Sequence, residues 1–302
     1  MRRLGTWRHG AVRSWRGELV FSAVVYLVVI LFALVCLFPF YLIVVNSFVD
    51  NKILNQEGYQ LYVKKLSFDS YKYLFQGRQA YISYRVTLFV TAVGSLMATA
   101  ITSMYAFVLS HKKVKYRNIM SFFTYVPMVM GTGLVGFYLL VAQWLHLKDT
   151  IWALIFPYLL NPFLVFVLVN FFRALPYELY ESASMDGAND IYVFFRIILP
   201  ISIPGIATVI LFYALTYWND WWLAILFINH DYLHPLQMMI RSLMSQINST
   251  QYVMGKSMYI QNMPSEGLKL ATVCITIGPI VLLYPLVQRY FVKGLTLGAV
   301  KG

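Results

Sequence analysis

The sequence predicts an all-α membrane protein with six transmembrane helices. Hydrophobic residues fill 60% of the 302 positions and charged residues only 12%, whereas soluble domains average about 45–50% apolar and about 25% charged residues. A helix needs about 20 mainly apolar residues to cross the hydrocarbon core of a bilayer. Six runs meet this requirement, at residues 19–47, 86–110, 119–144, 150–172, 200–227 and 268–291.

The first run follows a basic segment, for which a cleaved signal peptide is the alternative interpretation. Because the run is too long for a signal-peptide core and no small-residue cleavage site follows it, we expect an uncleaved first helix. The third run contains Pro127 and the glycines of 131–136, which we expect to break its helix. The basic segment holds five arginines: Arg2, Arg3, Arg8, Arg13 and Arg16.

The net charge of +12 is explained by the orientation of a membrane protein, because the basic residues gather at the ends of apolar runs. A nucleic-acid partner is therefore not expected. The short loop at 111–118 is the most basic one, and short basic loops stay in the cytoplasm. With six spans, this loop and both termini lie in the cytoplasm, and the long loops at 48–85 and 228–267 lie outside. The loop at 111–118 contains Lys112, Lys113, Lys115 and Arg117.

Residues 173–199 form a polar segment between the fourth and fifth runs, on the predicted cytoplasmic side. Pro176 is suited to the first turn of a helix, where its missing N–H has no partner in any case. Glu178 and Glu181 favour the positive N-terminal end of that helix. Gly187 accepts a positive φ and is expected to end the helix.

A second short helix is expected after the glycine. Asn189 or Asp190 can cap its N-terminus, and Pro200 opens the next apolar run. The segment therefore predicts two short helices joined by a bend, suited to docking against a partner in the water phase. The helical period places four apolar residues of the second helix on one face, namely Ile191, Phe194, Phe195 and Ile198.

This segment resembles the EAA loop of the membrane subunits of ABC importers, in which Glu-Ala-Ala precedes Asp-Gly-Ala and an apolar end with Leu-Pro. Seven residues match: Glu181, Ala183, Asp186, Gly187, Ala188, Leu199 and Pro200. Ser182 replaces the first alanine of the pattern. In that family the loop is the coupling helix, which seats in a cleft of the cytoplasmic ATPase. An ordinary cytoplasmic loop with helix caps is the alternative. The resemblance implies ATPase coupling by Glu181, Ala183, Asp186, Gly187, Ala188 and Phe194.

The C-terminus is similar to the tail of maltose-type permeases, with the pattern Gly-Leu-Thr-x-Gly-x-Val-Lys-Gly at 294–302. In these permeases the tail extends between the ATPase subunits. A frayed basic tail is the alternative. The overlapping Phe-Val-Lys-Gly is more similar to permeases assigned to larger or acidic oligosaccharides. The resemblance implies an ATPase contact by Gly294, Thr296, Gly298 and Lys301.

The chain is thus identified as a member of the carbohydrate-uptake, maltose-permease-like group of binding-protein-dependent ABC importer permeases. The resemblance implies the type I permease fold with a cytoplasmic coupling helix. It implies a peripheral segment at 1–84, a core transmembrane domain at 85–292 and a cytoplasmic tail at 293–302. The expected partners in a bacterial inner membrane are lipid, a second permease subunit, two ATPase subunits and an extracytoplasmic solute-binding protein. The expected function is oligosaccharide import along a pathway of which this chain forms half.

Aromatic and amide side chains suit the apolar faces and hydroxyls of sugars. They are dense around Asp220, toward the outer end of the fifth run. A charge at that depth is costly unless it faces a polar cavity or a partner. An interfacial belt of Trp and Tyr is the alternative for this cluster. We expect the substrate path to include Asn161, Tyr217, Trp218, Asn219 and Asp220.

Motifs of several other functions are missing from the sequence. It has no Gly-x-x-x-x-Gly-Lys-Ser/Thr phosphate loop, so ATP hydrolysis is expected on a separate polypeptide and the chain is not expected to be an enzyme. No metal site is expected at the two cysteines, Cys36 and Cys274, or at the pair His230 and His234, because neither pair has the sequence context of metal ligands. No cofactor is expected. Two alternatives stay open: a permease for a peptide, polyamine or phosphonate, and a secondary transporter that works alone.

Overall fold

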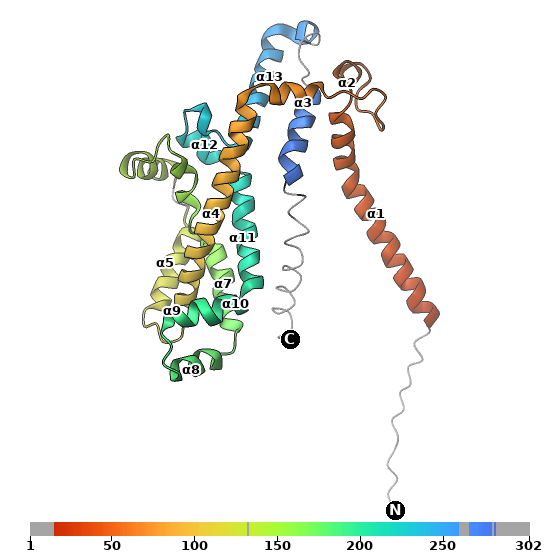
Figure 1. The fold of residues 1–302 in the computed structure, drawn as a ribbon. Coiled ribbons are helices and arrows are strands. Elements are labelled where there is room, and N and C mark those ends of the chain that lie inside the picture. The colour runs from red at the N-terminus through yellow and green to blue at the C-terminus, as the bar shows by residue number, and fades with distance from the viewer. Residues whose placement is uncertain (1–14, 132, 260–265, 280, 282–302) are drawn as a thin grey trace, which may run out of the picture.

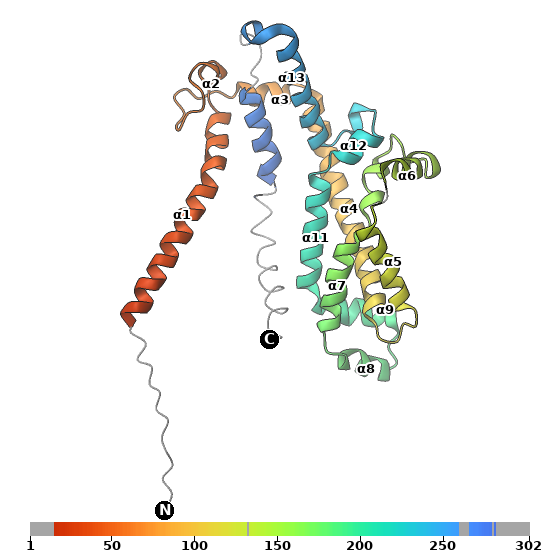
Figure 2. The ribbon, with the colours of Figure 1, turned by 180° about the vertical axis from the view of Figure 1, so that it is seen from behind.

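The computed structural model describes residues 15–131, 133–259, 266–279 and 281. Within these residues every regular element is a helix, apart from one isolated bridge between Val49 and Leu66, so the all-α class is confirmed. α1 (Trp15–Ser47) stands apart from a bundle of helices, and helix 266–279 lies between α1 and the bundle (Figure 1, Figure 2). The bundle contains α4 (Arg78–Ser110), α5 (Arg117–Val129), α7 (Pro162–Ala174) and α11 (Ile203–Trp218).

α4 is the central helix, because α5, α7, α11 and α13 (Leu236–Tyr259) all contact it. Its buried face carries small side chains such as Ala98 and Ala106. Small residues let helix backbones approach closely, which favours the van der Waals packing that holds helices together in a membrane. At Gly94 the approach is so close that an added Cβ would lie 2.7 Å from the ring of Tyr217 on α11.

Two tyrosine hydroxyls of α11 join the bundle to the segment that precedes α7. The Tyr217 hydroxyl donates to the Ile155 carbonyl at 2.9 Å. The Tyr213 hydroxyl lies 2.6 Å from Thr102 Oγ1 and accepts from the Asn161 amide at 2.9 Å. Both rings are buried. A buried hydroxyl that has its partners stabilises the packing it joins, because leaving it unpaired would be costly.

The helices that can cross a membrane follow the predicted runs. Among the described residues, two single helices are long and apolar enough to cross a membrane, at Glu18–Ser47 and Arg78–Ser110. Three further pairs of helices are long and apolar enough when each bent pair is counted as one span, which gives up to five spans. α4 begins at Arg78, earlier than the predicted start at 86. The sixth predicted span, 268–291, lies within the described residues only as far as 279 and at 281.

The third and fourth spans are bent where Gly, or Asn and Pro, interrupt the apolar run. α5 is followed by α6 (Leu134–Leu139) and the π turn η1 (Leu140–Trp144) at an angle of 113°, which confirms the break expected there. Two 3-10 turns, η2 (Ile151–Leu154) and η3 (Phe156–Tyr158), meet α7 at 48°. Asn161 and Pro162 form this second bend, with Asn161 as the N-cap of α7.

The predicted extent of the fifth span, 200–227, is wrong. α11 ends at Trp218, and a separate helix, α12 (Trp222–Phe227), follows a turn at Asn219 and Asp220. Leu223, Ala224 and Phe227 of α12 are apolar because they are buried, and not because α12 continues the span. Hydropathy alone cannot tell two buried helices from one longer helix.

The polar segment between α7 and α11 contains four short elements. α9 to α10 form one helical piece, which meets α11 at an angle of 84°. The elements are α8 (Glu178–Met185), α9 (Asp190–Val193), the π turn η4 (Phe194–Ile198) and α10 (Leu199–Ile201).

Both long loops that the sequence places outside the membrane contain helices that the sequence analysis missed. α2 (Asn51–Glu57) and α3 (Asp69–Gln76) lie in the first loop, and η5 (Asp231–Leu233) and α13 in the second. These helices lie at the end of the molecule opposite α8 (Figure 1). An amphipathic helix has no long apolar run, so a search for spans passes over it.

The membrane-crossing part of α1 buries none of its side chains within the chain. Large apolar residues such as Phe21 and Phe32 are exposed along it. A helix that is apolar all round belongs in lipid or against another subunit. The far end of α1 is tied to the outer loop, because Asn46 Nδ2 donates to the Gln60 carbonyl at 2.8 Å.

We expect Gly94→Ala to destabilise the bundle, because the added methyl group would overlap the Tyr217 ring. Overpacking of this kind costs about 1–3 kcal/mol. The measurement is the thermal unfolding midpoint of the chain, purified in detergent with the subunits that accompany it, and this midpoint should fall. Gly136→Ala is the control, since nothing lies within 4 Å of a Cβ there. An equal fall in both variants would contradict the close contact.

Candidate functional site

The polar segment forms two helical pieces joined at Gly187, as predicted. α8 begins at Glu178, so Pro176 lies just before the helix and not in its first turn as expected. Gly187 has a φ of +80°, a left-handed conformation that glycine adopts without strain. The Ala188 amide donates back to the Ala183 carbonyl at 3.0 Å. This six-residue closure is the usual way in which a glycine ends a helix and turns the chain.

The second piece is capped by Asn189, which decides between the two residues that the sequence left open. The Asn189 side chain accepts from the Tyr192 amide at 2.7 Å. Asp190 has a different partner, because its carboxylate accepts a hydrogen bond from the Tyr180 hydroxyl on α8. The two pieces are therefore tied to each other by a side-chain bond as well as by the chain.

The apolar face predicted for the second piece is only half right. Phe194 and Ile198 are buried, but Ile191 and Phe195 are 70% and 52% exposed. The cause is the π turn η4, in which hydrogen bonds span five residues rather than four. Val193 and Ile198 are five residues apart and both point inward, which a regular α-helical period does not predict.

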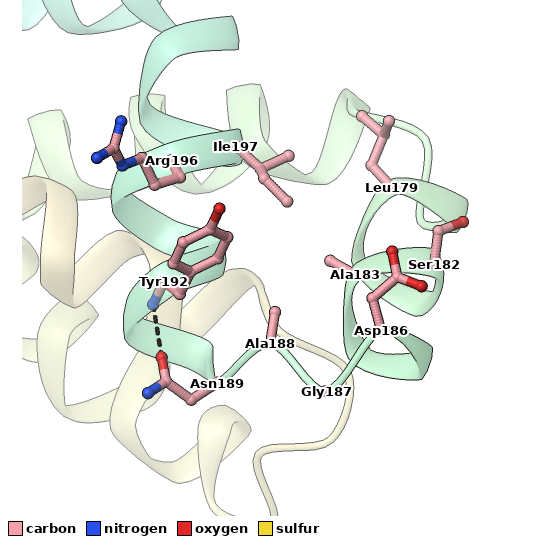
Figure 3. Close-up of a pocket in the computed structure, with 10 residues that line it drawn as sticks. All are labelled: Leu179, Ser182, Ala183, Asp186, Gly187, Ala188, Asn189, Tyr192, Arg196 and Ile197. Atoms are coloured by element: carbon pink, nitrogen blue, oxygen red, sulfur yellow. Dashed lines mark hydrogen bonds between the residues drawn. The ribbon is translucent and has the colours of Figure 1, made fainter.

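An open groove of about 760 Å³ runs between α8 and the second piece (Figure 3). Four of the six predicted coupling residues line it, namely Ala183, Asp186, Gly187 and Ala188. Asp186, the residue after α8, and Arg196 on η4 line the groove from opposite sides, and the Arg196 guanidinium points away from Asp186 (Figure 3). The lining therefore includes one residue of each charge sign.

The other two predicted coupling residues lie outside this groove. Glu181 is exposed on α8. Phe194 is buried, and its ring centroid lies 5.2 Å from that of Phe107 on α4. Phe194 thus holds the second piece against the bundle, whereas Glu181 faces solvent.

A brace behind α8, which the sequence analysis missed, consists of His111, Tyr177 and Tyr180. The His111 ring meets the Tyr180 ring edge-on, with centroids 4.1 Å apart at 87°, and lies 6.4 Å from the Tyr177 ring. His111 directly follows α4. It therefore connects the end of the central helix to α8. The signal in the sequence was the pair of tyrosines three residues apart at the start of α8, together with a histidine in the basic loop at 111–118.

Two lysines of the loop at 111–118 strengthen the brace. Lys112 lies 4.7 Å from the centroid of the Tyr177 ring, and Lys113 lies 5.3 Å from that of Tyr180. Cations at such distances are attracted to the electron-rich face of an aromatic ring. The sequence analysis used these lysines only as a signal of orientation. In the structure they also contact the tyrosines that carry α8.

Burial lowers the pKa of His111, because the charged imidazolium loses its hydration. The carboxylate of Asp190 acts in the opposite direction, and the cations Lys113 and Arg117 lower the pKa further. The pKa of the Tyr180 hydroxyl is raised, by burial and then by its bond to Asp190. The brace is thus built from groups that favour their neutral forms.

The structure brings two of the predicted path residues together at the opposite end of α11. The Tyr158 hydroxyl donates to Asp220 at 2.9 Å, and the Tyr158 ring lies 5.9 Å from that of Tyr217. Asp220 also accepts from the backbone amides of Trp222 and Leu223, so its carboxylate lies at the N-terminal end of α12, one residue before the N-cap Trp221. These contacts explain how a carboxylate is accommodated among aromatic rings.

The other path residues have partners of their own. Trp218 is buried and donates from Nε1 to the Thr276 carbonyl at 3.1 Å. Asn219 is exposed, and its Nδ2 donates to the Leu215 carbonyl at 2.9 Å. The Asn161 side chain caps α7. The predicted tail contacts at Gly294, Thr296, Gly298 and Lys301 lie outside the described residues.

The fold and the polar segment at 173–199 define a class of protein, the membrane-embedded permease subunit of a transporter. A family model described as "Binding-protein-dependent transport system inner membrane component" matches residues 91–297. The chain belongs to this family. The match covers α11 and the whole segment with the two helical pieces.

Similar proteins are permeases of the same kind. The chain is 35% identical to the "Polygalacturonan/rhamnogalacturonan transport system permease protein YtcP" of Bacillus subtilis (strain 168), over 94% of this chain and 99% of YtcP. It is 39% identical to "Protein LplC" of the same organism, over 89% of this chain and 90% of LplC. A chain of a bacterial ABC transporter involved in the import of the acidic polysaccharide alginate has a TM-score of 0.79 at 24% identity, covering 91% and 98% of the two chains. This likeness confirms the ABC importer permease fold.

We expect the stability of the protein to fall as the pH decreases from about 7.5 to about 5.5, in part through His111. The unfolded histidine has a pKa of about 6.5, and burial lowers the folded value. The unfolded state then binds more protons, so this contribution is complete above the unfolded pKa and is lost as the pH falls toward the folded pKa. The measurement is the thermal midpoint as a function of pH.

The matched variant for this measurement is His111→Phe, which keeps an aromatic ring but cannot titrate. Its thermal midpoint should depend less on pH than that of the unsubstituted protein. His230→Phe is the control, because His230 is exposed at the opposite end of the molecule. A His111→Phe variant with the original pH dependence would show that His111 makes no such contribution.

Proposed function

We propose that this chain is one of two permease subunits of an ATP-driven importer of oligosaccharides and forms half of its translocation pathway. The observation that carries the proposal is the match, over nearly the full length of both chains, to a permease named for polygalacturonan/rhamnogalacturonan transport. ATP hydrolysis belongs to a separate polypeptide in this proposal, since the sequence contains no phosphate-binding loop.

Residues 181–195 couple this permease to the ATPase. Met185 is 83% exposed at the end of α8, an apolar side chain suited to a partner surface. α8 is braced against α4 by His111 and Tyr180, and the second piece leads through α10 into α11. Movement of a partner bound to this segment therefore reaches both α4 and α11. As the ATPase subunits close and open, the translocation pathway alternates between opening to the inside and opening to the outside.

The end of the molecule that carries α8 faces the cytoplasm. The basic loop at 111–118 lies at this end, against the tyrosines of α8 (Figure 2), and short basic loops favour the cytoplasmic side. α1 also begins at this end (Figure 1). The family description supports an inner-membrane location. We infer that both termini are cytoplasmic.

The assembly contains a second homologous permease subunit, two ATPase subunits and a solute-binding protein. The family description names a binding protein, and the exposed circumference of α1 offers a surface for lipid and for the second permease. Residues 1–84 form the peripheral segment, 85–292 the core and 293–302 the cytoplasmic tail. In the tail, the residues that contact the ATPase are Gly294, Thr296, Gly298 and Lys301.

The substrate path passes the outer end of α11. Asn161 and Asn219 are exposed, which supports a role for them in meeting sugar hydroxyls. Tyr217 and Trp218 are buried, and they position the wall behind the asparagines together with Asp220.

The assembly is tested by purifying the tagged chain from its own host membranes and identifying the accompanying proteins by mass spectrometry. We expect an ABC ATPase, a second permease and a solute-binding protein that binds oligosaccharides in a ligand screen. A chain that purifies alone and still transports would contradict the importer. A binding protein that retains a peptide, polyamine or phosphonate would contradict the substrate class.

We expect Gly187→Asp to uncouple ATP hydrolysis from uptake while the protein stays in the membrane. Nothing in the chain lies within 4 Å of a Cβ at Gly187, and aspartate adopts a positive φ more often than most residues, at a cost of about 1–2 kcal/mol. The fold should therefore accept the change, and the loss should come from a clash or charge at the partner surface. Uptake and ATP hydrolysis are measured together in proteoliposomes that contain the assembled transporter.

Gly77→Asp is the control for this variant, because it adds the same charge at the opposite end of the molecule. Gly77 is exposed in extended backbone between α3 and α4, with no atom closer than 3.9 Å to an added Cβ. It should leave the ATPase bound and its hydrolysis unchanged. Normal coupled transport by Gly187→Asp would remove the coupling role from this segment.

A further inference from the structure

A second groove lies at the end of the molecule opposite α8, between α12 and α13. It has a volume of about 560 Å³, within the range of roughly 300–1,000 Å³ found for ligand pockets. Most of its lining comes from one face of α13, including Arg241, Ser242, Ser245 and Ser249, with Ile225 of α12 beside them. No lining residue is acidic. One cation, several hydroxyls and a small apolar wall suit a polar ligand with a negative charge.

Arg241 is held in a defined orientation by an aromatic ring. Its guanidinium carbon lies 3.9 Å from the centroid of the Trp221 ring. Stacking fixes the guanidinium plane and leaves its N–H groups free to bind at their edges. Within the described part of the chain, no carboxylate forms an ion pair with Arg241. The side chain is thus arranged for an anion that the chain itself does not supply.

Trp222 offers a second aromatic surface next to this arginine. Its ring is perpendicular to that of Trp221, with centroids 5.7 Å apart, and the residue is 42% exposed. Trp222 and Ile225 are three residues apart on α12, so they share one side of the helix. An exposed indole stacks well on the apolar C–H face of a sugar ring.

The groove adjoins the proposed substrate path. Gln237 of α13 donates from Nε2 to Asn219 Oδ1 at 3.4 Å, and Asn219 directly precedes Asp220. α12 begins two residues later. A ligand in the groove would therefore lie next to the turn at which α11 ends.

We propose that this groove binds the carboxylate of acidic oligosaccharides, with Arg241 as the anion-binding residue. A uronate sugar carries a carboxylate where a neutral hexose has a hydroxymethyl group. The two oxygens of this carboxylate accept parallel hydrogen bonds from the guanidinium, the serine hydroxyls bind ring hydroxyls, and Trp222 stacks on the ring. The assignment rests on the proposed function and adds the charge of the substrate, in agreement with the acidic polymer for which YtcP is named.

A carboxylate of the solute-binding protein is the competing partner for Arg241, since that protein also docks on the outer face. Two measurements separate the two partners. The first uses the assembled transporter in nanodiscs without the binding protein, and follows tryptophan fluorescence during titration with trigalacturonate or its methyl ester.

We expect trigalacturonate to bind, and the uncharged ester to bind at least about tenfold more weakly. Arg241→Gln should weaken the binding of trigalacturonate by about tenfold or more, which is the scale of a lost charged hydrogen bond. Arg85→Gln is the control, because Arg85 is an exposed arginine 5.8 Å from the Tyr81 ring on α4, and it should bind as the unsubstituted protein does. No binding of trigalacturonate, or equal binding by Arg241→Gln, would overturn the site.

The second measurement is ATP-dependent uptake in proteoliposomes with the binding protein present. Arg241→Gln should lower uptake of trigalacturonate about tenfold and leave uptake of neutral arabinotriose unchanged. Equal loss of both would assign Arg241 to docking of the binding protein and overturn the sugar site. Unchanged uptake of both would also overturn it, with the importer itself intact. Failure of the unsubstituted transporter to import any oligosaccharide would instead reject the proposed function.

Discussion

The structure depends on the close contact between α4 and α11. In a bilayer, apolar side chains gain little by leaving lipid for one another, so helices associate through close packing and through hydrogen bonds between them. α4 supplies small residues on its buried face, and Gly94 lets the Tyr217 ring lie directly on its backbone. The hydroxyls of Tyr213 and Tyr217 then reach beyond α4 and hold the turns that lead into α7. Three helices are fixed by one contact surface.

This packing gives α11 two functional ends. At one end, α10 and η4 lead to the groove between α8 and the second helical piece. At the other end, the turn at Asn219 and Asp220 leads to α12 and to the groove beside Arg241. The two candidate sites therefore lie at opposite ends of one helix that packs against α4.

Features that depend on local chemistry could be predicted from the sequence. Gly187 ends α8 because glycine alone adopts its φ without strain. The capping preference limited the start of the second piece to Asn189 or Asp190, and the structure has Asn189 as the cap. Length and apolarity located the spans. Features set by tertiary packing could not be predicted in this way. The π turn η4 changes which residues face inward, and the brace of His111 on Tyr180 joins residues far apart in sequence.

Apolar runs gave a wrong prediction where a helix is buried in the protein but does not cross the membrane. α12 is apolar where it packs against η2 and α13, so its residues extended the predicted fifth span by a whole helix. α13 itself has one polar and one apolar side, and it therefore gave no signal in hydropathy. Both errors fall in the part of the chain that forms the groove with Arg241. A site made by two such helices becomes visible only when their relative placement is known.

The separation of α1 from the bundle bears on how the sequence can diverge. Its membrane-crossing part makes no buried contact within the chain, so exchange of one apolar residue for another there leaves the subunit's own fold unchanged. Within that part, the subunit's own fold requires only enough length and apolarity to cross the bilayer. The family model begins at residue 91, after α1 has ended. The choice among apolar residues there is thus set by lipid or by a neighbouring subunit and not by the bundle.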